Sequence, residues 1–131
     1  MKVEWDEWDG VVCCERTAED CSADDADAVL RLLDQSKHTL MTVRGGVRSL
    51  TIGGGVGRYV VFSQENDDGE IWEARTRRDV VSGGERVMVV AGGQEGDFSP
   101  DQVLTHDEAR LVLQEFFTAA SRSNTVDWVV V

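Results

Sequence analysis

The sequence predicts an α+β fold, a mainly antiparallel β-sheet of about five to seven strands with two packed helices. Three observations support this prediction. The centre of the chain alternates β-branched and aromatic segments with glycine-rich or acidic turns, which is typical of neighbouring strands. Two other segments carry apolar residues at helical spacing behind helix-start signals. The connections are short, and they favour antiparallel pairing because parallel neighbours need a long crossover.

The chain opens with two strand segments followed by a helix. Val3–Trp8 and Val11–Cys14 are rich in β-forming residues, and Asp9-Gly10 between them predicts a turn. Ser22 is the expected N-cap of a helix whose first turn is acidic, which suits the positive end of the helix dipole. We expect about three helical turns ending near Gln35. Its apolar stripe has the spacing i, i+3, i+4, i+7 and consists of Ala26, Val29, Leu30 and Leu33.

The middle of the chain predicts a series of strands joined by turns. The expected strands are His38–Val43, Val47–Ile52, Arg58–Ser63, Glu70–Arg75 and Arg86–Ala91. The last of them is strongly β-branched, so we expect it to be buried. The expected turns and loops between them are Gly45-Gly46, Gly53-Gly54-Gly55, the polar segment Glu65–Gly69, and a loop containing Gly83-Gly84.

A second helix and a final strand complete the prediction. Thr105 and Glu108 form the pattern of a capping box, in which each side chain bonds the backbone N–H of the other. The helix runs to about Ser121, and Asp127–Val131 closes the chain as a strand. No internal repeat or long linker divides the chain, so we expect residues 1–131 to form one domain. The apolar stripe of this helix is Ala109, Val112, Leu113, Phe116 and Ala120.

The charge of the chain is strongly acidic and uneven. Lys and Arg number 13 against 25 Asp and Glu, a net charge of −12. Residues 1–36 hold 11 acidic and 3 basic side chains, a net of −8. Phosphate is repelled by such a surface, which argues against direct binding of nucleic acid or of an anionic membrane, and a basic protein partner is attracted. Solubility is the simpler explanation of the charge taken alone.

Targeting signals and cysteines point to the cytoplasm. The N-terminus has no basic start followed by an apolar core, and no apolar run reaches membrane-spanning length. The cysteines, Cys13, Cys14 and Cys21, are odd in number, and adjacent cysteines cannot pair without backbone strain. We therefore expect reduced, buried thiols and no disulfide.

No motif in the sequence identifies a catalytic or metal site. Gly53–Gly57 is followed by a strand, whereas a phosphate-binding loop is followed by a helix. His106 and Glu108 match half of a zinc deaminase signature, but no Pro-Cys-x-x-Cys segment lies downstream. The spacing of the cysteines matches no common zinc pattern. We assign no cofactor, metal or catalytic residue and expect a protein that is not an enzyme.

The four tryptophans divide into two pairs. Trp72 and Trp128 lie in expected strands and are assigned to the core. Trp5 and Trp8 differ by three positions, so in a strand they point to opposite faces and one is more exposed. An exposed ring among carboxylates suits a basic partner, and a core anchor at the edge of the sheet fits the same pattern. The sequence leaves these two alternatives open.

Two sets of acidic and aromatic residues are candidates for contact with a partner. The first set lies in the acidic N-terminal quarter of the chain. The second set lies in the turn at 65–70, for which a solvated hairpin tip is the simpler interpretation. The first set is Trp5, Asp6, Glu7, Trp8, Asp9, Asp24, Asp25 and Asp27, and the second is Glu65, Asp67, Asp68 and Glu70.

An ordered set of segments resembles the first-numbered immunity-protein family of bacterial polymorphic toxin systems. The order is L-T-I-G-G-G-x-G-x-Y-V-V, E-I-W, V-x-V-V-A-G-G-Q-x-G-D-F, a Phe-bearing helix and D-W near the end. The resemblance covers about residues 37–131 and is best in Leu50–Val61, Val87–Phe98 and Phe116–Trp128. Contacts placed in the first 36 residues rest on charge rather than on this resemblance.

The resemblance implies a small cytoplasmic protein that binds and neutralises a cognate toxin domain, and we expect a 1:1 complex. Toxins paired with this family are often nucleic-acid-modifying, with deaminases prominent among them. Such a toxin needs a basic substrate surface, which agrees with the acidic charge of this chain. The alternative binding role is a secretion-system adaptor or chaperone that binds unfolded or export segments. A small enzyme with a pair of carboxylates is a third class, which a deep pocket would favour.

Overall fold

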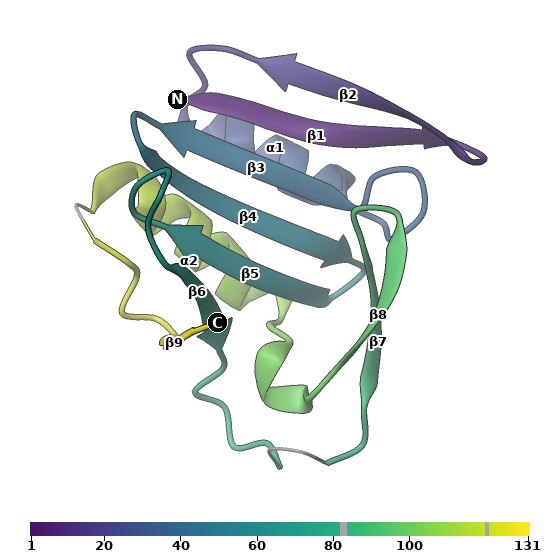
Figure 1. Ribbon diagram of the computed structural model, residues 1–131, viewed down its shortest axis with the longest axis vertical. Coiled ribbons are helices and arrows are strands. Elements are labelled where there is room, and N and C mark those ends of the chain that lie inside the picture. The colour runs from purple at the N-terminus through teal and green to yellow at the C-terminus, as the bar shows by residue number, and fades with distance from the viewer. Residues whose placement is uncertain (82–83, 120) are drawn as a thin grey trace.

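In the computed structural model of the protein, which describes residues 1–81, 84–119 and 121–131, seven strands form one antiparallel sheet. Their spatial order is β2-β1-β3-β4-β5-β6-β9, and the two helices lie together on one side of the sheet (Figure 1). A separate two-stranded hairpin, β7–β8, stands at one end of the sheet, steeply inclined to its strands (Figure 1). The α+β prediction is therefore confirmed.

The elements follow the predicted order along the chain, except that β8 (Gln94–Phe98) and a short 3₁₀ segment were not among the predicted elements. The helices are α1 (Ala23–Leu32) and α2 (His106–Thr118), with a short 3₁₀ segment at Pro100–Gln102. The strands are β1 (Lys2–Asp9), β2 (Val12–Ala18), β3 (Leu40–Gly45), β4 (Arg48–Gly55), β5 (Arg58–Gln64), β6 (Ile71–Arg75), β7 (Val87–Ala91), β8 (Gln94–Phe98) and β9 (Asp127–Val130).

The main core lies between the sheet and the helices. Alternate strand residues face the helices, and Met41, Leu50 and Ile52 are almost fully buried against them. The apolar stripes of both helices supply the other half of this core, as their spacing predicted. We call the opposite side of the sheet the helix-free face. It carries Thr42, Thr51, Phe62 and Glu73, which are aligned across four neighbouring strands.

Only part of the helix-free face is covered. Val60 of β5, Val89 of β7 and Val103 form a second, smaller buried cluster there. This cluster seats the β7–β8 hairpin on the sheet. The remainder of the face, towards β1 and β2, has no helix over it in the described parts of the chain, and the hairpin meets it at Gly93, beside Trp8 of β1 (Figure 1).

The glycine run that predicted a turn lies inside β4 instead. Gly53-Gly54-Gly55 are buried strand residues, and the turn is formed by Val56 and Gly57. A Cβ atom on Gly53 would lie 2.5 Å from Cβ of Ala91, and one on Gly55 would lie 2.5 Å from the carbonyl oxygen of Leu33. The predicted turn at Gly53-Gly54-Gly55 was therefore wrong. Glycine is needed at these positions because the hairpin and the end of α1 approach the backbone of β4 closely.

Three further predictions are corrected by the structure. The β-branched strand at 87–91 belongs to the hairpin rather than the main sheet, and only Val89 in it is buried. The first helix ends at Leu32, three residues before Gln35, whose backbone takes a left-handed φ of +63°. The second helix ends at Thr118 rather than near Ser121. Gly83 of the expected loop and Ala120 of the expected apolar stripe lie outside the described residues.

Both predicted helix starts are confirmed, and the second one carries a partly buried carboxylate. Glu108 accepts the backbone N–H of Thr105 at 3.0 Å, the hydroxyl of Thr76 at 2.6 Å and Nε of Arg78 at 2.8 Å. Burial raises the pKa of this carboxyl, but these hydrogen bonds and the Arg78 charge outweigh burial and leave the pKa below its usual value of 4.5. Glu108 therefore fastens the start of α2 to the chain after β6.

We expect Glu108→Gln to lower stability by about 1 kcal/mol at pH 7, because the amide retains the cap and loses the charge-assisted bonds. Because the pKa of Glu108 is lower in the folded protein, the Glu108 carboxylate stabilises the fold above pH 4.5. This stabilisation is lost as the pH falls through the pKa that Glu108 has in the folded protein. The difference between variant and wild type should therefore shrink below about pH 4.5. Urea unfolding between pH 7 and pH 3 measures it, and a constant difference would contradict this role.

Candidate partner-binding face

Asp6 of β1 is the centre of a buried hydrogen-bond network. Its carboxylate accepts the backbone N–H groups of Thr39 at 2.6 Å and Leu40 at 3.0 Å, together with the Thr39 hydroxyl. It also accepts the indole N–H of Trp8 at 2.7 Å. The Thr39 hydroxyl oxygen in turn accepts the backbone N–H of Gly93, in the turn between β7 and β8, at 2.9 Å. Asp6 thus joins β1, the residues before β3 and the hairpin turn.

Trp8 is held in place by this network. A Cβ atom on Gly93 would lie 2.1 Å from the edge of the Trp8 ring, so the ring packs directly against the hairpin turn. Trp5 faces the other way and packs against the main core. The two rings therefore lie on opposite faces of β1, as the spacing predicted, and each is half-buried. Trp8 is the one that lies on the helix-free face.

We expect Gly93→Ala to destabilise the fold by about 3 kcal/mol, since left-handed backbone costs about 1–2 kcal/mol and the clash with the Trp8 ring adds to it. Gly57→Ala is the matched control, because Gly57 has a similar φ of +79° and has no atom within 4 Å of the added Cβ. Gly57→Ala should therefore cost only the free energy of placing alanine in left-handed backbone. Urea denaturation of both variants tests this, and equal costs would show that the ring does not pack on the turn.

Beside Trp8 the helix-free face contains a cavity of about 330 Å³. It lies over β1, β2 and β3, and the hairpin turn borders it at Gly92. Its charged side chains are those of Glu4, Asp6, Glu15 and Arg44. The remaining lining residues are Trp5, Trp8, Cys13, Leu40, Met41 and Thr42.

The rim of this cavity holds two neighbouring carboxyl groups. A hydrogen bond from Glu15 and another from Arg44, whose Nε lies 2.9 Å from Oε1 of Glu4, lower the pKa of Glu4. The same hydrogen bond to Glu4, reinforced by the charge of Glu4, raises the pKa of Glu15. Two such groups repel each other when both are ionised. Lys2 and Arg44 already pair with Glu4, at 3.9 Å and 2.9 Å. A further basic side chain at this rim would therefore be placed beside Glu15.

The model of the family described as Immunity protein Imm1 matches residues 15–130 of the chain. The protein belongs to the Imm1 immunity protein family. The family match begins at residue 15, in β2, whereas the resemblance seen in the sequence begins only at about residue 37. A comparison with curated proteins found no match. The partner that this family implies is a toxin.

The remaining β1 candidates of this immunity protein lie near the cavity without lining it. Glu7 faces the helix side of the sheet, where it accepts Nε of Arg16 at 2.6 Å and lies 3.5 Å from Nζ of Lys37. The hydrogen bond from Arg16 lowers the pKa of Glu7. Asp9 is exposed at the tip of the β1–β2 hairpin. Asp9 adds negative charge near the cavity, whereas the charge of Glu7 is paired on the other face of the sheet.

The α1 candidates of the immunity protein lie on the other side of the sheet. Asp27 is buried between the helices, where Arg31 donates to it at 3.1 Å and Nε of Arg110 lies 3.3 Å away. Asp25 closes the capping box with Ser22, and the hydrogen bonds from Ser22 lower its pKa. Asp24 is exposed. Asp25 and Asp27 thus have structural roles in the helix layer.

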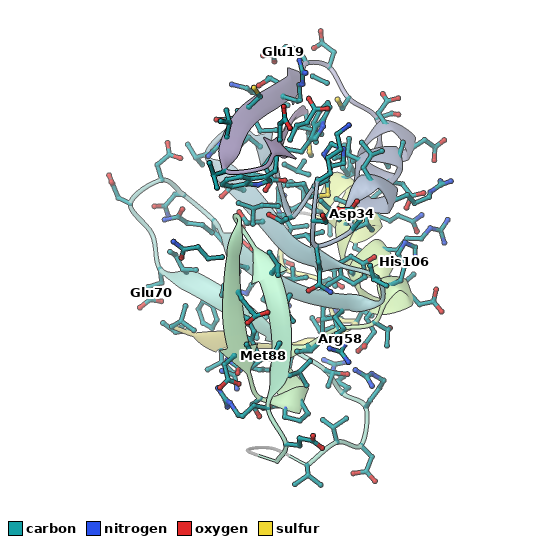
Figure 2. All side chains as sticks on the ribbon, turned by 90° about the vertical axis from the view of Figure 1, so that its right-hand side faces the viewer. Glu19, Asp34, Arg58, Glu70, Met88 and His106 are labelled. Atoms are coloured by element: carbon teal, nitrogen blue, oxygen red, sulfur yellow. The ribbon has the colours of Figure 1, made fainter. Side chains whose placement is uncertain are left out.

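The acidic turn between β5 and β6 lies at the opposite end of the sheet from Trp8. Pairing aligns Lys2, at the start of β1, with Gln64, at the end of β5, whereas Trp8 is near the other end of β1. Figure 2 shows Glu70 of this turn well away from the β1–β2 hairpin at the top of the view. Glu65 pairs with Arg48 and Arg122. Asp67, Asp68 and Glu70 are exposed.

Two of the three cysteines and the other two tryptophans depart from their predicted burial. Cys21 is buried, and burial raises the pKa of its thiol. Cys13 and Cys14 are exposed, because β2 is an edge strand with solvent on both faces. Trp72 is half-buried beneath the guanidinium of Arg122, which lies 3.8 Å from the ring centroid. Trp128 is half-buried at the margin of the main core.

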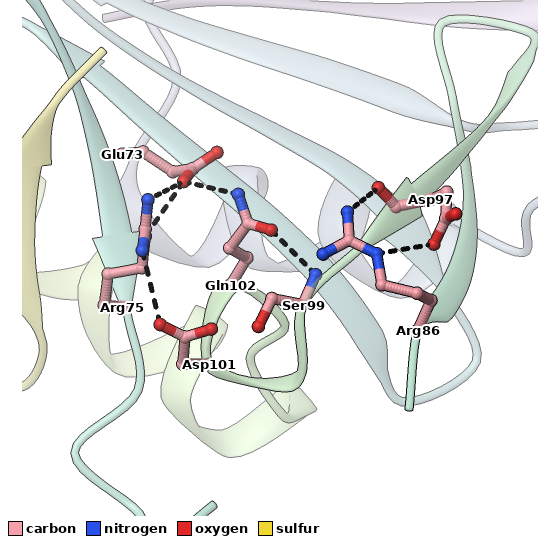
Figure 3. A network of polar contacts seen from close by, with 7 residues as sticks. All are labelled: Glu73, Arg75, Arg86, Asp97, Ser99, Asp101 and Gln102. Carbon is pink, nitrogen blue, oxygen red and sulfur yellow. Dashed lines mark hydrogen bonds and ion pairs between the residues drawn. The ribbon is translucent and has the colours of Figure 1, made fainter. Parts of the chain in front are cut away.

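A second network, which the sequence did not predict, lies on the helix-free face at β6. Figure 3 shows Glu73, which is buried, accepting Nε of Arg75 and the side-chain amide of Gln102, each at 2.9 Å. Gln102 also accepts the backbone N–H of Ser99 at 2.7 Å. This network fixes the 3₁₀ segment against the sheet.

Among the described residues, no group of three or more His, Cys, Asp or Glu is arranged to hold a metal ion. No helix of the described chain is long and apolar enough to cross a membrane.

Proposed function

We propose that this immunity protein neutralises a nucleic-acid-modifying toxin domain, a deaminase or a nuclease, by covering its active site or substrate surface. The observation that carries the proposal is the cavity on the helix-free face, where Trp8 lies beside the carboxyl groups of Glu4 and Glu15. A toxin that acts on nucleic acid carries a basic surface for phosphate. A basic side chain of that surface fits the acidic rim, with its aliphatic part against the indole ring.

The charges and the ring have different roles in this proposal. The net charge of −12 steers a basic toxin towards the immunity protein and increases the rate of association. The half-buried Trp8 is a rigid anchor that loses its remaining solvent contact in the complex, and such aromatic anchors supply much of the affinity of protein interfaces. Asp6 acts indirectly, because it fixes the orientation of the indole ring.

We propose further that the protein acts in the cytoplasm, as a single domain in a 1:1 complex, and that it inhibits rather than catalyses. Contact is assigned to Trp8 with Glu4, Glu15 and Asp9. Asp24 lies in α1, on the helix side of the sheet, and the turn at 65–70 lies at the other end of the sheet, so they are left out of this proposed contact.

A rescue assay tests the proposed function. The toxin domain encoded beside this protein's gene is expressed in a bacterial host with and without the immunity protein, and survivors are counted. Specific protection together with a co-purified complex is the expected result. If a demonstrably lethal toxin domain is not neutralised, or if only its unfolded or export segments are bound, the adaptor or chaperone role is correct instead.

A further inference from the structure

The outer edge of β2 is an open strand edge. β2 pairs with β1 in an unbroken antiparallel register from Val3↔Ala18 to Asp9↔Val12. It is the last strand of the sheet, and no strand, helix or hairpin of the described chain lies along its outer side (Figure 1). Every residue of β2 except Ala18 is exposed. The outward backbone N–H and C=O groups of this strand are therefore free to pair with another chain.

This edge carries two charged side chains, Glu15 and Arg16, but it lacks other features that usually protect edge strands. It contains no proline, its register has no bulge, and at seven residues it is longer than β9, the four-residue strand at the other edge. Val11 and Val12, at the turn into β2, are 94% and 62% exposed. A straight, uncovered edge of this length is a template for strand addition.

We propose that β2 accepts an extended basic segment of the toxin as an additional antiparallel or parallel strand of the sheet. This inference rests on the proposed function and specifies how the toxin binds. An added strand lies about 4.8 Å beyond β2, and every second side chain of that strand points to the helix-free face. One of these side chains stands beside Glu15. A lysine or arginine at such a position reaches the rim of the cavity.

The charge around this edge selects a basic segment over a second copy of the protein. Residues 1–20 contain seven acidic and two basic side chains. Pairing of β2 with β2 of another copy would bring two such acidic hairpins together, on molecules that each carry a net charge of −12. Like charges directly opposite each other destabilise a strand pair, whereas opposite charges stabilise it.

Two proline variants at neighbouring positions test the inference. In an antiparallel pair the N–H groups of successive residues point to opposite sides, so of Cys13 and Cys14 one donates towards β1 and the other towards the open edge. Cys13→Pro and Cys14→Pro therefore form a matched pair, with Cys13→Ala and Cys14→Ala as controls for the loss of each thiol. The variant that keeps the β1–β2 hydrogen bonds should melt at the wild-type temperature, and the variant that loses one should melt at a lower temperature.

The binding of a catalytically inactivated toxin domain, encoded beside this protein's gene, is then measured by calorimetry. We expect the proline variant that keeps the wild-type melting temperature to bind at least tenfold more weakly than the alanine variant at the same position. A folded proline variant with wild-type affinity would overturn the strand-addition inference and leave the proposed function intact. If the wild-type protein does not bind the toxin, both the proposed function and this inference are wrong.

Hydrogen exchange of the wild-type protein gives a second test that needs no variant to fold. Alternate amides within Val12–Ala18 should exchange at least tenfold more slowly in the complex with the inactivated toxin. Unchanged exchange in β2 would contradict strand addition. Slow exchange of the same amides without toxin, in a protein that sediments as a dimer, would show that the edge is occupied by a second copy.

Discussion

Replacing Asp6 by alanine is expected to destabilise the protein by about 3 kcal/mol, because Asp6 is the buried acceptor of several hydrogen bonds. The substitution leaves two backbone N–H groups, of Thr39 and Leu40, and the Thr39 hydroxyl without an acceptor in a buried position. Each unsatisfied buried donor costs about 1–3 kcal/mol, and rearrangement with water recovers part of that cost. Urea denaturation measures the change.

Asp9→Ala is the control for Asp6→Ala. Both substitutions remove a carboxylate from β1, but Asp9 is exposed and should leave the melting temperature unchanged. Near-ultraviolet circular dichroism adds a local readout, since the Trp8 ring loses its hydrogen bond only in the Asp6 variant. Equal stability of the two variants would mean that the Asp6 network does not hold the hairpin turn to β1.

Charge reversal at the cavity rim, Glu15→Lys, is expected to weaken toxin binding by about tenfold to a hundredfold, because close charge pairs in protein interfaces contribute on this scale. The introduced ammonium lies beside Glu4 and neutralises the carboxylate that would face the toxin. The exposed position leaves the fold intact. Kinetic binding measurements at low and high salt give both rate constants.

Asp67→Lys is the matched control for this variant. It changes the net charge by the same amount at an exposed position in the turn between β5 and β6, at the far end of the sheet. We expect Asp67→Lys to slow association slightly and to leave dissociation unchanged, because it alters only long-range steering. If the two variants weaken binding equally, the toxin senses net charge alone and the cavity is not the contact site.

Local signals explain what the sequence could predict. The helix starts at Ser22 and Thr105 depend on residues three positions apart, so the capping boxes are visible in the sequence alone. The strands between Leu40 and Arg75 follow one another through short turns, and each pairs with its neighbour in the chain. Such contacts need no knowledge of distant segments.

Distant contacts explain what the sequence could not predict. Asp6 has the same sequence surroundings as the exposed acids around it, but its partners Thr39 and Leu40 are more than 30 residues away. Asp27 is a similar case, since its partner Arg110 comes from the other helix. Gly53 and Gly55 satisfy the pattern of a turn, and only the approach of Ala91 and Leu33 shows why glycine is needed in a strand.

The candidate site combines both kinds of residue. Trp8 and the acidic character of β1 are evident in the sequence, and the opposite orientations of Trp5 and Trp8 follow from the strand period. Glu4 and Glu15 were not among the predicted contacts, because their proximity depends on the register of the β1–β2 hairpin. The cavity also needs the hairpin turn at Gly92, which comes from a different part of the chain.

The exposure of β2 has a consequence for how such proteins diversify. None of the side chains from Val12 to Thr17 belongs to either buried cluster, so the main core is complete without them. Under the proposed strand addition at β2, substitutions there change the surface offered to the toxin at little cost in folding stability, provided that the residues still favour an extended strand. An immunity protein with this architecture is thus able to follow a changing toxin by exchanging edge residues one at a time, without repacking its interior.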